Sequence, residues 1–448
     1  MLRTRTSYGG RPVAASESLV EATDSLTPVT PNGGHSGVAH AAEPVVTPVT
    51  NIIDRLILFN HGREPERLHY KYARMRASIF GFYRGTSHLF YQDWPQGSPL
   101  DRAPATWLTG DLHLENFGSY RTDNGQVHFD LGDFDESALG PASWDLARFA
   151  TSVLVGARSL GIGGRDASSL IQIFTRSYAS CLKDGKARWV ERQATKGIVR
   201  DLMNDLKDRT QRELLDSRTE VNGKARRLFI DRKYTLPVPE VVRGRISAFM
   251  KRWAARQPDP KFYRLLDVAR RVSGISHLGL PRYVLLVEGE GSPHGNCLLD
   301  LKLAQQSVLA PYLRLPQPEW KNQAERVVAI QGRMQAVTPA LLQPVLLNRQ
   351  PYVLRELQPA GDRLGLDLWN GKARRLEKAI GTAGQLLAWA QLRSGGRQGS
   401  AIADELIEFG QADWWHQELT AYCRFYATQV ESDYGEYCKA FDAGELGN

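Results

Sequence analysis

The spacing of apolar residues predicts helices at both ends of the first part of the chain. From Ile52 to about Arg76, and again from Trp144 to Ala157, apolar residues recur at intervals of three and four, as in a helix with one buried face. Between them, Ala105–Thr109 and Val127–Leu131 are typical of strands, and the second follows the turn formers Asp123-Asn124-Gly125. This part of the chain is therefore predicted to be helical with a small sheet.

The pattern changes at about residue 225. Short runs separated by turn formers predict strands at Tyr283–Val287, Cys297–Leu301 and Tyr352–Arg355, with one helix at about Glu319–Ala336 among them. Helical spacing returns from about 371 to 442, so the chain is predicted to be an α+β protein. Its predicted parts are a disordered tail (1–50), a helical catalytic lobe (51–224), a β-rich nucleotide-lobe-like region (225–365) and C-terminal helices completing the catalytic lobe (366–448).

The first fifty residues differ in composition from the rest. They are rich in Ser, Thr, Pro, Gly, Ala and Val and nearly lack aromatic residues, so they bury too little surface to offset the entropy of ordering. Elsewhere no apolar run approaches the roughly 18 residues needed to cross a bilayer. The four cysteines form no CxxC pair, which fits a reducing cytoplasm. A cytoplasmic protein without membrane contact is expected.

The formal net charge of +8 comes from one segment. Residues 183–256 hold 20 Lys or Arg against 10 Asp or Glu. Such a run is typical of solvated helices. It also suits a surface for anionic partners such as nucleotides or nucleic acid. No interleaved aromatic pattern of a nucleic-acid-binding module accompanies it.

The strongest chemical signal is the run Gly110–Asn116, which reads Gly-Asp-Leu-His-Leu-Glu-Asn. Asp111 and Asn116 have the spacing of a kinase catalytic loop. A carboxylate can orient or deprotonate an attacking hydroxyl, and an amide oxygen can bind Mg²⁺ without adding charge. Further along, Asp133, with Asp135 as the alternative, offers a second carboxylate to bridge Mg²⁺ to phosphates.

Two other side chains near this run have a predicted role. His113 lies inside the loop and is expected to orient it through hydrogen bonds rather than to ligate a metal. Arg84 precedes the loop. It could pair with structural acids, or it could reach a phosphate or an acidic substrate, because Arg makes bidentate contacts.

The residues after the loop add to this signal. Gly140-Pro141 and Trp144-Asp145-Leu146-Ala147 follow Asp133 in an order that resembles aminoglycoside and choline kinases. The resemblance implies a two-lobed protein-kinase-like fold. It also gives Asp145 a structural role, in which its carboxylate braces the catalytic loop.

The β-rich region holds candidates for the nucleotide-binding half of such a site. Gly274–Gly279, with Ser276 in its middle, precedes a predicted strand as a phosphate-covering turn does. Lys302 ends the next apolar run, and Glu356 ends the last strand of the region. These residues reproduce the order of elements in the small lobe of a kinase.

In a kinase, however, the glycine-rich turn and the lysine precede the catalytic loop. Here they follow it, so we predict a circularly permuted kinase-like fold, which is tolerable when chain ends meet at the surface. Lys302 must then fold back to face Asp133. The Glu that pairs with this lysine is expected on the intervening helix, as Glu319 or Glu325.

The chain is similar to the bacterial family named domain of unknown function 2252 from about Arg74 to Asp442. The motifs that carry the resemblance are Arg74–Arg76, Phe80–Gly85, Gly110–Gly118, Phe129–Ser152, Gly274–Gly279, Leu301–Ala304 with Ser307, Tyr352–Gln358, Ala388–Ser394 and Tyr426–Tyr434. Three sites depart from the family pattern. Ser276 and His277 occupy the middle of the glycine-rich stretch, Leu303 follows the lysine, and Gln391 stands where His is usual.

These patterns predict a phosphotransferase that moves a phosphoryl group from Mg–ATP to a small-molecule or protein acceptor. GTP as donor and nucleotidyl transfer are open alternatives. The altered glycine-rich stretch favours a second reading, a nucleotide-binding pseudokinase with a regulatory role, which the intact Asp111, Asn116 and Asp133 oppose. A metal-dependent phosphoesterase shares Gly-Asp-x-His but needs several further His ligands, and no Gly-His-x-His run occurs.

Overall fold

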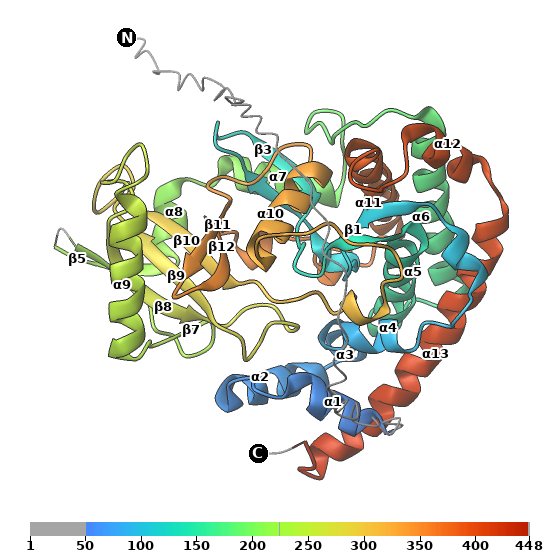
Figure 1. The fold of residues 1–448 in the computed structure, drawn as a ribbon, viewed down its shortest axis with the longest axis horizontal. Coiled ribbons are helices and arrows are strands. Elements are labelled where there is room, and N and C mark those ends of the chain that lie inside the picture. The colour runs from blue at the N-terminus through green and yellow to red at the C-terminus, as the bar shows by residue number, and fades with distance from the viewer. Residues whose placement is uncertain (1–50, 224, 447–448) are drawn as a thin grey trace, which may run out of the picture. The chain divides into compact units, whose positions relative to one another are not determined.

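The computed structural model describes residues 51–223 and 225–446 (Figure 1). The predicted tail, residues 1–50, lies outside the described residues. The structure is 49% helical and 15% strand, so the predicted α+β class is confirmed. Among the helices of the described ranges, none is long and apolar enough to pass through a membrane.

Helices and short strands alternate along the chain. The helices are α1 (Ile52–Asn60), α2 (Pro65–Arg76), α3 (Ile79–Gly85), α4 (Ser87–Gln92), α5 (Ala142–Ser159), α6 (Gly164–Asp184), α7 (Ile198–Asp208), α8 (Gln211–Asp216), α9 (Glu240–Ala254), α10 (Gln323–Met334), α11 (Ala373–Ser394), α12 (Ala403–Gln411) and α13 (Trp414–Asp442). The strands are β1 (Ala105–Leu108), β2 (Phe117–Arg121), β3 (Val127–Leu131), β4 (Ala138–Pro141), β5 (Thr219–Asn222), β6 (Ala225–Leu228), β7 (Thr235–Leu236), β8 (Leu265–Arg271), β9 (Arg282–Val287), β10 (Cys297–Leu303), β11 (Gln343–Leu347) and β12 (Gln350–Glu356).

A six-stranded antiparallel sheet is built from the β-rich region, in the order β11-β12-β10-β9-β8-β7. Strands β8, β9 and β10 form a meander, and β12 pairs with the free side of β10. One face of the sheet is apolar and packs on α9, where Phe249 and Met250 cluster with Leu285, Leu299 and Leu354. In Figure 1, α9 lies along the left side of this sheet, away from the helices of the right-hand part.

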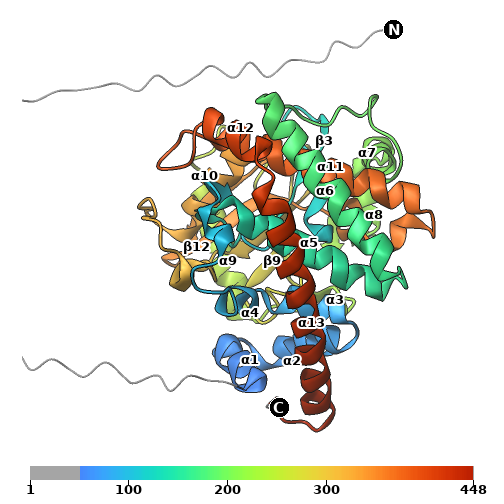
Figure 2. The ribbon, with the colours of Figure 1, turned by 90° about the vertical axis from the view of Figure 1, so that its right-hand side faces the viewer.

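Helix α5 is the centre of the helical part. Every residue from Ala142 to Ala157 is buried, because this stretch is apolar on nearly all sides, as a helix surrounded by others must be. Helices α6 and α13 pack on α5, and α11 packs on α6. Phe149 stacks on Phe174 of α6 with ring centroids 4.2 Å apart. Figure 2 shows α13 running in front of α5.

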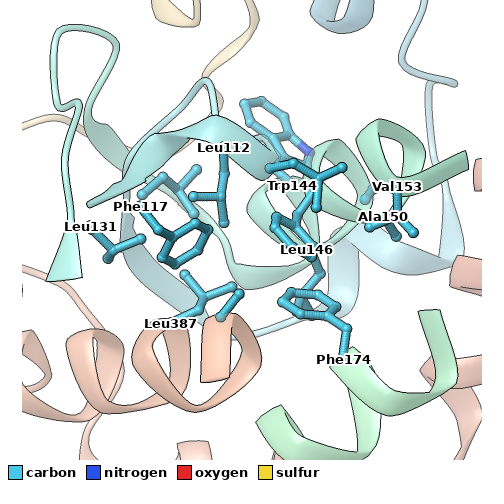
Figure 3. Packing of buried hydrophobic residues seen from close by; sticks show 14 of the residues in the cluster. Leu112, Phe117, Leu131, Trp144, Leu146, Ala150, Val153, Phe174 and Leu387 are labelled. Atoms are coloured by element: carbon cyan, nitrogen blue, oxygen red, sulfur yellow. The ribbon is translucent and has the colours of Figure 1, made fainter. Parts of the chain in front are cut away.

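The loop that carries Asp111 is anchored in this core. Leu112 is fully buried and lies with Phe117, Trp144 and Leu146 in one apolar cluster (Figure 3). Gly110 adopts φ +82°, and a Cβ at this position would collide with the backbone carbonyl of Glu136. Only glycine fits this turn, which is why the loop begins with one.

All five predicted strands are present, as β1, β3, β9, β10 and β12. The predicted helix from Ile52 to Arg76 is broken, because α1 ends at Asn60 and α2 begins at Pro65. Proline lacks the N–H that a continuous helix needs and is suited to a first turn.

Two further helix expectations need correction in the β-rich region. The predicted helix at Glu319–Ala336 is shorter, because the side chain of Asn322 accepts hydrogen bonds from the backbone N–H groups of Ala324 and Glu325 and starts α10 there. Helix α9 was not predicted. Its apolar residues Val242, Ile246, Phe249, Met250 and Trp253 do have helical spacing, and they cover the sheet.

Candidate functional site

The loop Gly110–Asn116, which the sequence predicts to be a catalytic loop, is held in place by residues of α5. Asp145 is fully buried, and its carboxylate accepts hydrogen bonds from the backbone N–H groups of Thr109 at 2.8 Å and Gly110 at 3.1 Å. Burial raises the pKa of Asp145 to about 6 against the effect of these bonds. Asp145 therefore holds the loop in place, as the resemblance implied.

Asp111 shares a second buried contact with α5. Its Oδ1 accepts hydrogen bonds from Nε of Arg148 at 3.1 Å and from an Nη at 2.9 Å, and the guanidinium also lies 3.7 Å from the ring centroid of Tyr83. Burial raises the pKa of Asp111, and Arg148 opposes this rise. Among the described residues, Oδ2 of Asp111 has no hydrogen-bond partner. One carboxylate oxygen is thus fixed while the other is free to accept a proton.

Asn116 and His113 have different surroundings. Nδ2 of Asn116 donates to the backbone carbonyl of Asp111 at 2.5 Å, and the Asn116 carbonyl accepts from the N–H of Gly132 at 2.7 Å. Asn116 therefore lies beside the residue preceding Asp133. His113 is buried, and its Nδ1 accepts from the backbone N–H of Glu115 at 3.1 Å, so it shapes the loop.

Beyond β3, side chains from three distant segments meet in what we call the Lys302 group: Asp133, Asp135, His277 and Lys302. The ligand atoms of Asp133, Asp135 and His277 lie within 4.8 Å of one another. Nζ of Lys302 is 3.6 Å from Oδ1 of Asp133 and pairs more closely with Oδ2 of Asp135. Nε2 of His277 lies 2.6 Å from the same Oδ2 of Asp135. These acidic oxygens form a candidate cation site that Lys302 shares.

The charges of the Lys302 group depend on one another. Burial lowers the pKa of Lys302 to about 8, although Asp133 opposes the shift. Burial would raise the pKa of Asp133, but the nearby Lys302, His277 and Arg363 hold it below its ordinary value. Asp133 therefore stays a carboxylate at neutral pH, with its side chain 26% exposed.

The glycine-rich stretch Gly274–Gly279 lies directly against α3 and the start of α2. Oγ of Ser276 donates to the carbonyl of Arg84 at 3.1 Å, and Arg63 donates to the carbonyls of Ser276 and Leu278 at 2.6 and 2.9 Å. Gly279 has φ +91°, and a Cβ there would lie 2.7 Å from Cβ of Arg63. These contacts place His277 over Asp135.

The expected Glu partner of Lys302 needs correction. Neither Glu319 nor Glu325 forms an ion pair within the described residues, and Lys302 pairs instead with Asp133 and Asp135. Helix α10 contributes Arg326, which is buried. Arg326 donates to the carbonyl of Asp135 at 2.7 Å and to that of Gln305 at 2.9 Å. The intervening helix thus positions the acidic segment rather than the lysine.

The sheet face that carries Lys302 is strongly charged. Opposed residues of an antiparallel pair share a face, so Lys302 and Arg282 lie together, as do Asp300 and Arg355. The buried carboxylate of Asp300 contacts Arg282 at 2.5 Å and Arg271 at 2.9 Å, with Arg355 at 3.8 Å. Three guanidiniums therefore surround one carboxylate, which leaves the surroundings of Asp300 net positive.

Glu356 is not brought to this face. It pairs with Leu299 in the register of β10 and β12, so its side chain lies on the side opposite Lys302. There burial raises the pKa of Glu356 to about 7, with Arg121 opposing the rise. The strand register, which the sequence does not reveal, separates Glu356 from the other predicted site residues.

A pocket of about 660 Å³ adjoins the charged face. Its lining residues come from β9, from the end of β8 and from loops before β7, after β8 and after β12, among them Val284, Arg271, Tyr234, Ser273, Leu357 and Gly361. Arg271 belongs both to this pocket and to the charged cluster around Asp300. A ligand in the pocket would therefore meet apolar walls and a positive end.

Residues 63–440 match the model of a family described as an uncharacterized protein conserved in bacteria (DUF2252). The chain belongs to this family. The match includes the Gly110–Asn116 loop, the Lys302 group and the charged face, and it confirms the resemblance to domain of unknown function 2252. No curated protein and no solved structure matches the chain.

Several site residues of this family member were not predicted from sequence. His277 was noticed only as a departure from the glycine-rich pattern. Arg148 follows Asp145 by three positions, so both face the same side of α5, and this spacing is a usable signal. Arg326 and Arg363 have no such signal, because only tertiary packing brings them to Asp135 and Asp133.

Proposed function

We propose that the protein is a kinase-like phosphotransferase that moves the terminal phosphoryl group of Mg–ATP to a hydroxyl acceptor. One observation carries the proposal. Lys302 contacts Asp135, 167 residues away in the chain, and lies 3.6 Å from Asp133. A lysine beside a metal-binding carboxylate, with a second carboxylate on a nearby loop, is the set of groups that holds and transfers a phosphoryl group in kinases.

The order of elements supports the same proposal. The glycine-rich stretch connects β8 to β9, Lys302 lies on the next strand, β10, and α10 follows it before β11 and β12. In protein kinases a glycine-rich loop covers the phosphates, a lysine on the third strand holds them, and a helix follows. Here these elements come after the catalytic loop, so we infer a circularly permuted kinase-like fold.

The donor atoms near Asp133 suit Mg²⁺. The ion prefers oxygen ligands, and the carboxylates of Asp133 and Asp135 would hold it. Asn116 is proposed as a further ligand because its backbone contacts Gly132, which precedes Asp133. When bound, Mg²⁺ supplies positive charge that offsets the phosphate oxygens. Lys302 pairs with both carboxylates, so it competes with a divalent ion for them. When the ion binds, we propose that the ammonium of Lys302 turns to the phosphates.

Each of these residues has a proposed role in the transfer of the phosphoryl group. Oδ2 of Asp111 accepts the proton of the acceptor hydroxyl, while Arg148 holds Oδ1. The hydroxyl oxygen forms a bond to the terminal phosphorus as the bond from that phosphorus to the bridging oxygen breaks, and ADP leaves. The ammonium of Lys302 stabilises the phosphate oxygens. The 660 Å³ pocket is proposed to hold the nucleoside.

The proposal is tested by binding and product analysis. Calorimetry should show that the full chain binds ATP only with Mg²⁺, and that Asp133→Ala loses most of this binding while the exposed control Asp208→Ala keeps it. Incubation with Mg–ATP and a metabolite pool should give one product heavier by a phosphoryl group. Equal Mg–ATP affinity in Asp133→Ala and the parent would contradict the metal assignment.

A specific observation favours one alternative, a nucleotide-binding pseudokinase with a regulatory role. Ser276 and His277 tie the glycine-rich stretch to Arg84 and Asp135, where a phosphate-covering loop would stay free. Tight Mg–ATP binding with no product in any pool would support this alternative over transfer. A phosphoesterase is less well supported, because the one metal-ligating group within residues 51–223 and 225–446 has a single His.

A further inference from the structure

The turn between α1 and α2 contacts the backbone of the glycine-rich stretch. Nη1 of Arg63 donates to the carbonyls of Ser276 at 2.6 Å and Leu278 at 2.9 Å. The N–H of the next residue, Glu64, donates to the carbonyl of Gly279 at 3.0 Å. Carbonyl groups of the stretch therefore point repeatedly toward this turn, and Arg63 accepts no role in the chemistry described above.

Arg63 is itself held in place. Its Cζ lies 5.1 Å from the ring centroid of Phe59 on α1, a cation–π contact, and burial lowers its pKa only to about 10, so it is a cation at neutral pH. A Cβ on Gly279 would lie 2.7 Å from Cβ of Arg63, so the close approach requires glycine there. Glu64 also pairs with Arg270 of β8 at 2.7 Å. The turn is thus tied to the strand that precedes the stretch.

The direction of these carbonyls fixes the direction of the neighbouring N–H groups. The peptide units of the stretch are trans, and in a trans unit the C=O and the N–H point in opposite directions. The N–H of His277 shares its unit with the carbonyl of Ser276. The N–H of Gly279 likewise shares one with the carbonyl of Leu278, so both N–H groups point away from Arg63. Neither has a hydrogen-bond acceptor among the described residues.

We infer that Arg63 is a positioning residue, which holds the glycine-rich stretch so that the N–H groups of His277 and Gly279 bind phosphate oxygens of the ligand. This inference rests on the proposed phosphotransfer. Neighbouring backbone N–H groups without acceptors in the protein form anion-binding sites in glycine-rich turns. The imidazole of His277 lies 2.6 Å from Asp135, so the stretch borders the Lys302 group, where the phosphates are proposed to lie.

The test compares ligands that carry phosphates with one that does not. Calorimetry of the full chain measures adenosine, Mg²⁺ with a non-hydrolysable ATP analogue, and Mg²⁺ with tripolyphosphate. Arg63→Gln should weaken binding of both phosphate ligands by about tenfold or more, because hydrogen bonds to a charged ligand are misplaced, and keep adenosine affinity within about twofold. Arg63→Lys, which can still donate to one carbonyl, should lose less. The exposed control Arg165→Gln should bind all three as the parent does.

Hydrogen exchange gives a second readout. In the parent, amides of the glycine-rich stretch should gain protection when the analogue binds, because the N–H groups of His277 and Gly279 then have acceptors. Arg63→Gln should lose this gain even with saturating ligand. Gly279→Ala disturbs the same contact from the other side and should reproduce the selective loss, which keeps the test open if Arg63→Gln does not fold. Gly435→Ala, with open space around it on α13, is the control.

The outcomes separate the inference from the function on which it rests. Equal loss of adenosine and of the phosphate ligands, or unchanged binding in the Arg63 and Gly279 variants, would overturn the positioning role. Tripolyphosphate binding that depends on Arg63, in a chain that binds neither adenosine nor the analogue, would keep the phosphate site and overturn the phosphotransferase. A parent chain that binds none of the three ligands would overturn both.

Discussion

The Gly110–Asn116 loop and the Lys302 group lie within electrostatic range of each other, but different interactions hold them in place. Asp111 and the loop are anchored by Leu112 in the apolar core and by Asp145 and Arg148 from a single helix. The Lys302 group joins side chains from the β-rich region and the helical part mainly through charge. The first region is fixed by packing and hydrogen bonds. The second is held by ion pairs, so we expect it to rearrange if a divalent ion or a phosphate adds its charge.

This difference predicts that substitutions in and around the loop lower the rate of phosphoryl transfer or the free energy of unfolding. Asp111→Asn should reduce phosphoryl transfer by roughly 10²–10⁴-fold, or about 3–5 kcal/mol in activation free energy, because an amide cannot accept the hydroxyl proton. Mg–ATP binding should be kept, because the ion pair of Asp111 is with Arg148 and not with a member of the Lys302 group. The measurement is single-turnover transfer beside calorimetric binding. Transfer at the parent rate would leave Asp111 a purely structural residue.

The next largest effect is expected from Asp145, whose carboxylate holds the Gly110–Asn116 loop. Asp145→Ala removes the acceptor for two backbone N–H groups and the hydroxyl of Thr109, all of them buried. We expect a loss of about 3 kcal/mol in the free energy of unfolding, measured with urea. The exposed control Asp404→Ala should change it by less than about 0.5 kcal/mol. A small effect in Asp145→Ala would mean that Leu112 alone anchors the loop.

Glu356 tests the face opposite Lys302 through pH. Its pKa is raised from 4.5 to about 7, so protonation stabilises the folded protein below about pH 4.5, and this contribution is lost as the pH rises through 7. Glu356→Gln should therefore be more stable than the parent by about 3 kcal/mol at pH 8 and match it near pH 4. Urea unfolding at both pH values, with the exposed Glu418→Gln as control, measures this.

The same variant tests which face of the sheet binds the nucleotide. Because Glu356 points away from Lys302, Glu356→Gln should bind Mg–ATP as tightly as the parent. Weaker nucleotide binding would place Glu356 in the nucleotide site despite the strand register.

The smallest expected effect concerns the charge balance of the Lys302 group. Lys302→Met should weaken Mg–ATP binding by about tenfold, or about 1.4 kcal/mol. In the same variant Mg²⁺ alone should stabilise the chain more than it stabilises the parent, because Asp133 and Asp135 lose their ammonium partner. Thermal unfolding with Mg²⁺ and with Mg–ATP tests both expectations. The exposed Lys321→Met is the control.

The Lys302→Met variant also distinguishes two roles for a lysine at a strand end, phosphate binding and the prevention of aggregation. An edge lysine discourages aggregation, but β10 is a central strand between β9 and β12. If Lys302→Met aggregated but bound its ligands as the parent does, the result would support an aggregation-preventing role for Lys302, despite its place on a central strand.

The local parts of the site could be predicted from the sequence. Asp111, Asn116 and Asp145 are separated by short stretches of chain, and their types and spacing reflect chemistry that works over one loop and one helix turn. Helical and strand periodicity likewise depends on near neighbours, so β1, α5 and β9 were predicted. The break before Pro65 follows from local backbone chemistry that periodicity alone does not register.

The family and the α+β class could be predicted from the sequence, because they depend on composition and short-range pattern, and the same pattern predicts the Gly110–Asn116 loop. Which distant charges meet is seen only in the folded chain. Strand register placed Lys302 and Glu356 on opposite faces, since a shift of one residue turns a side chain to the other side. Packing of α10 brought Arg326, rather than a glutamate, to Asp135. Such pairings depend on where whole elements pack, and no spacing along the chain records that.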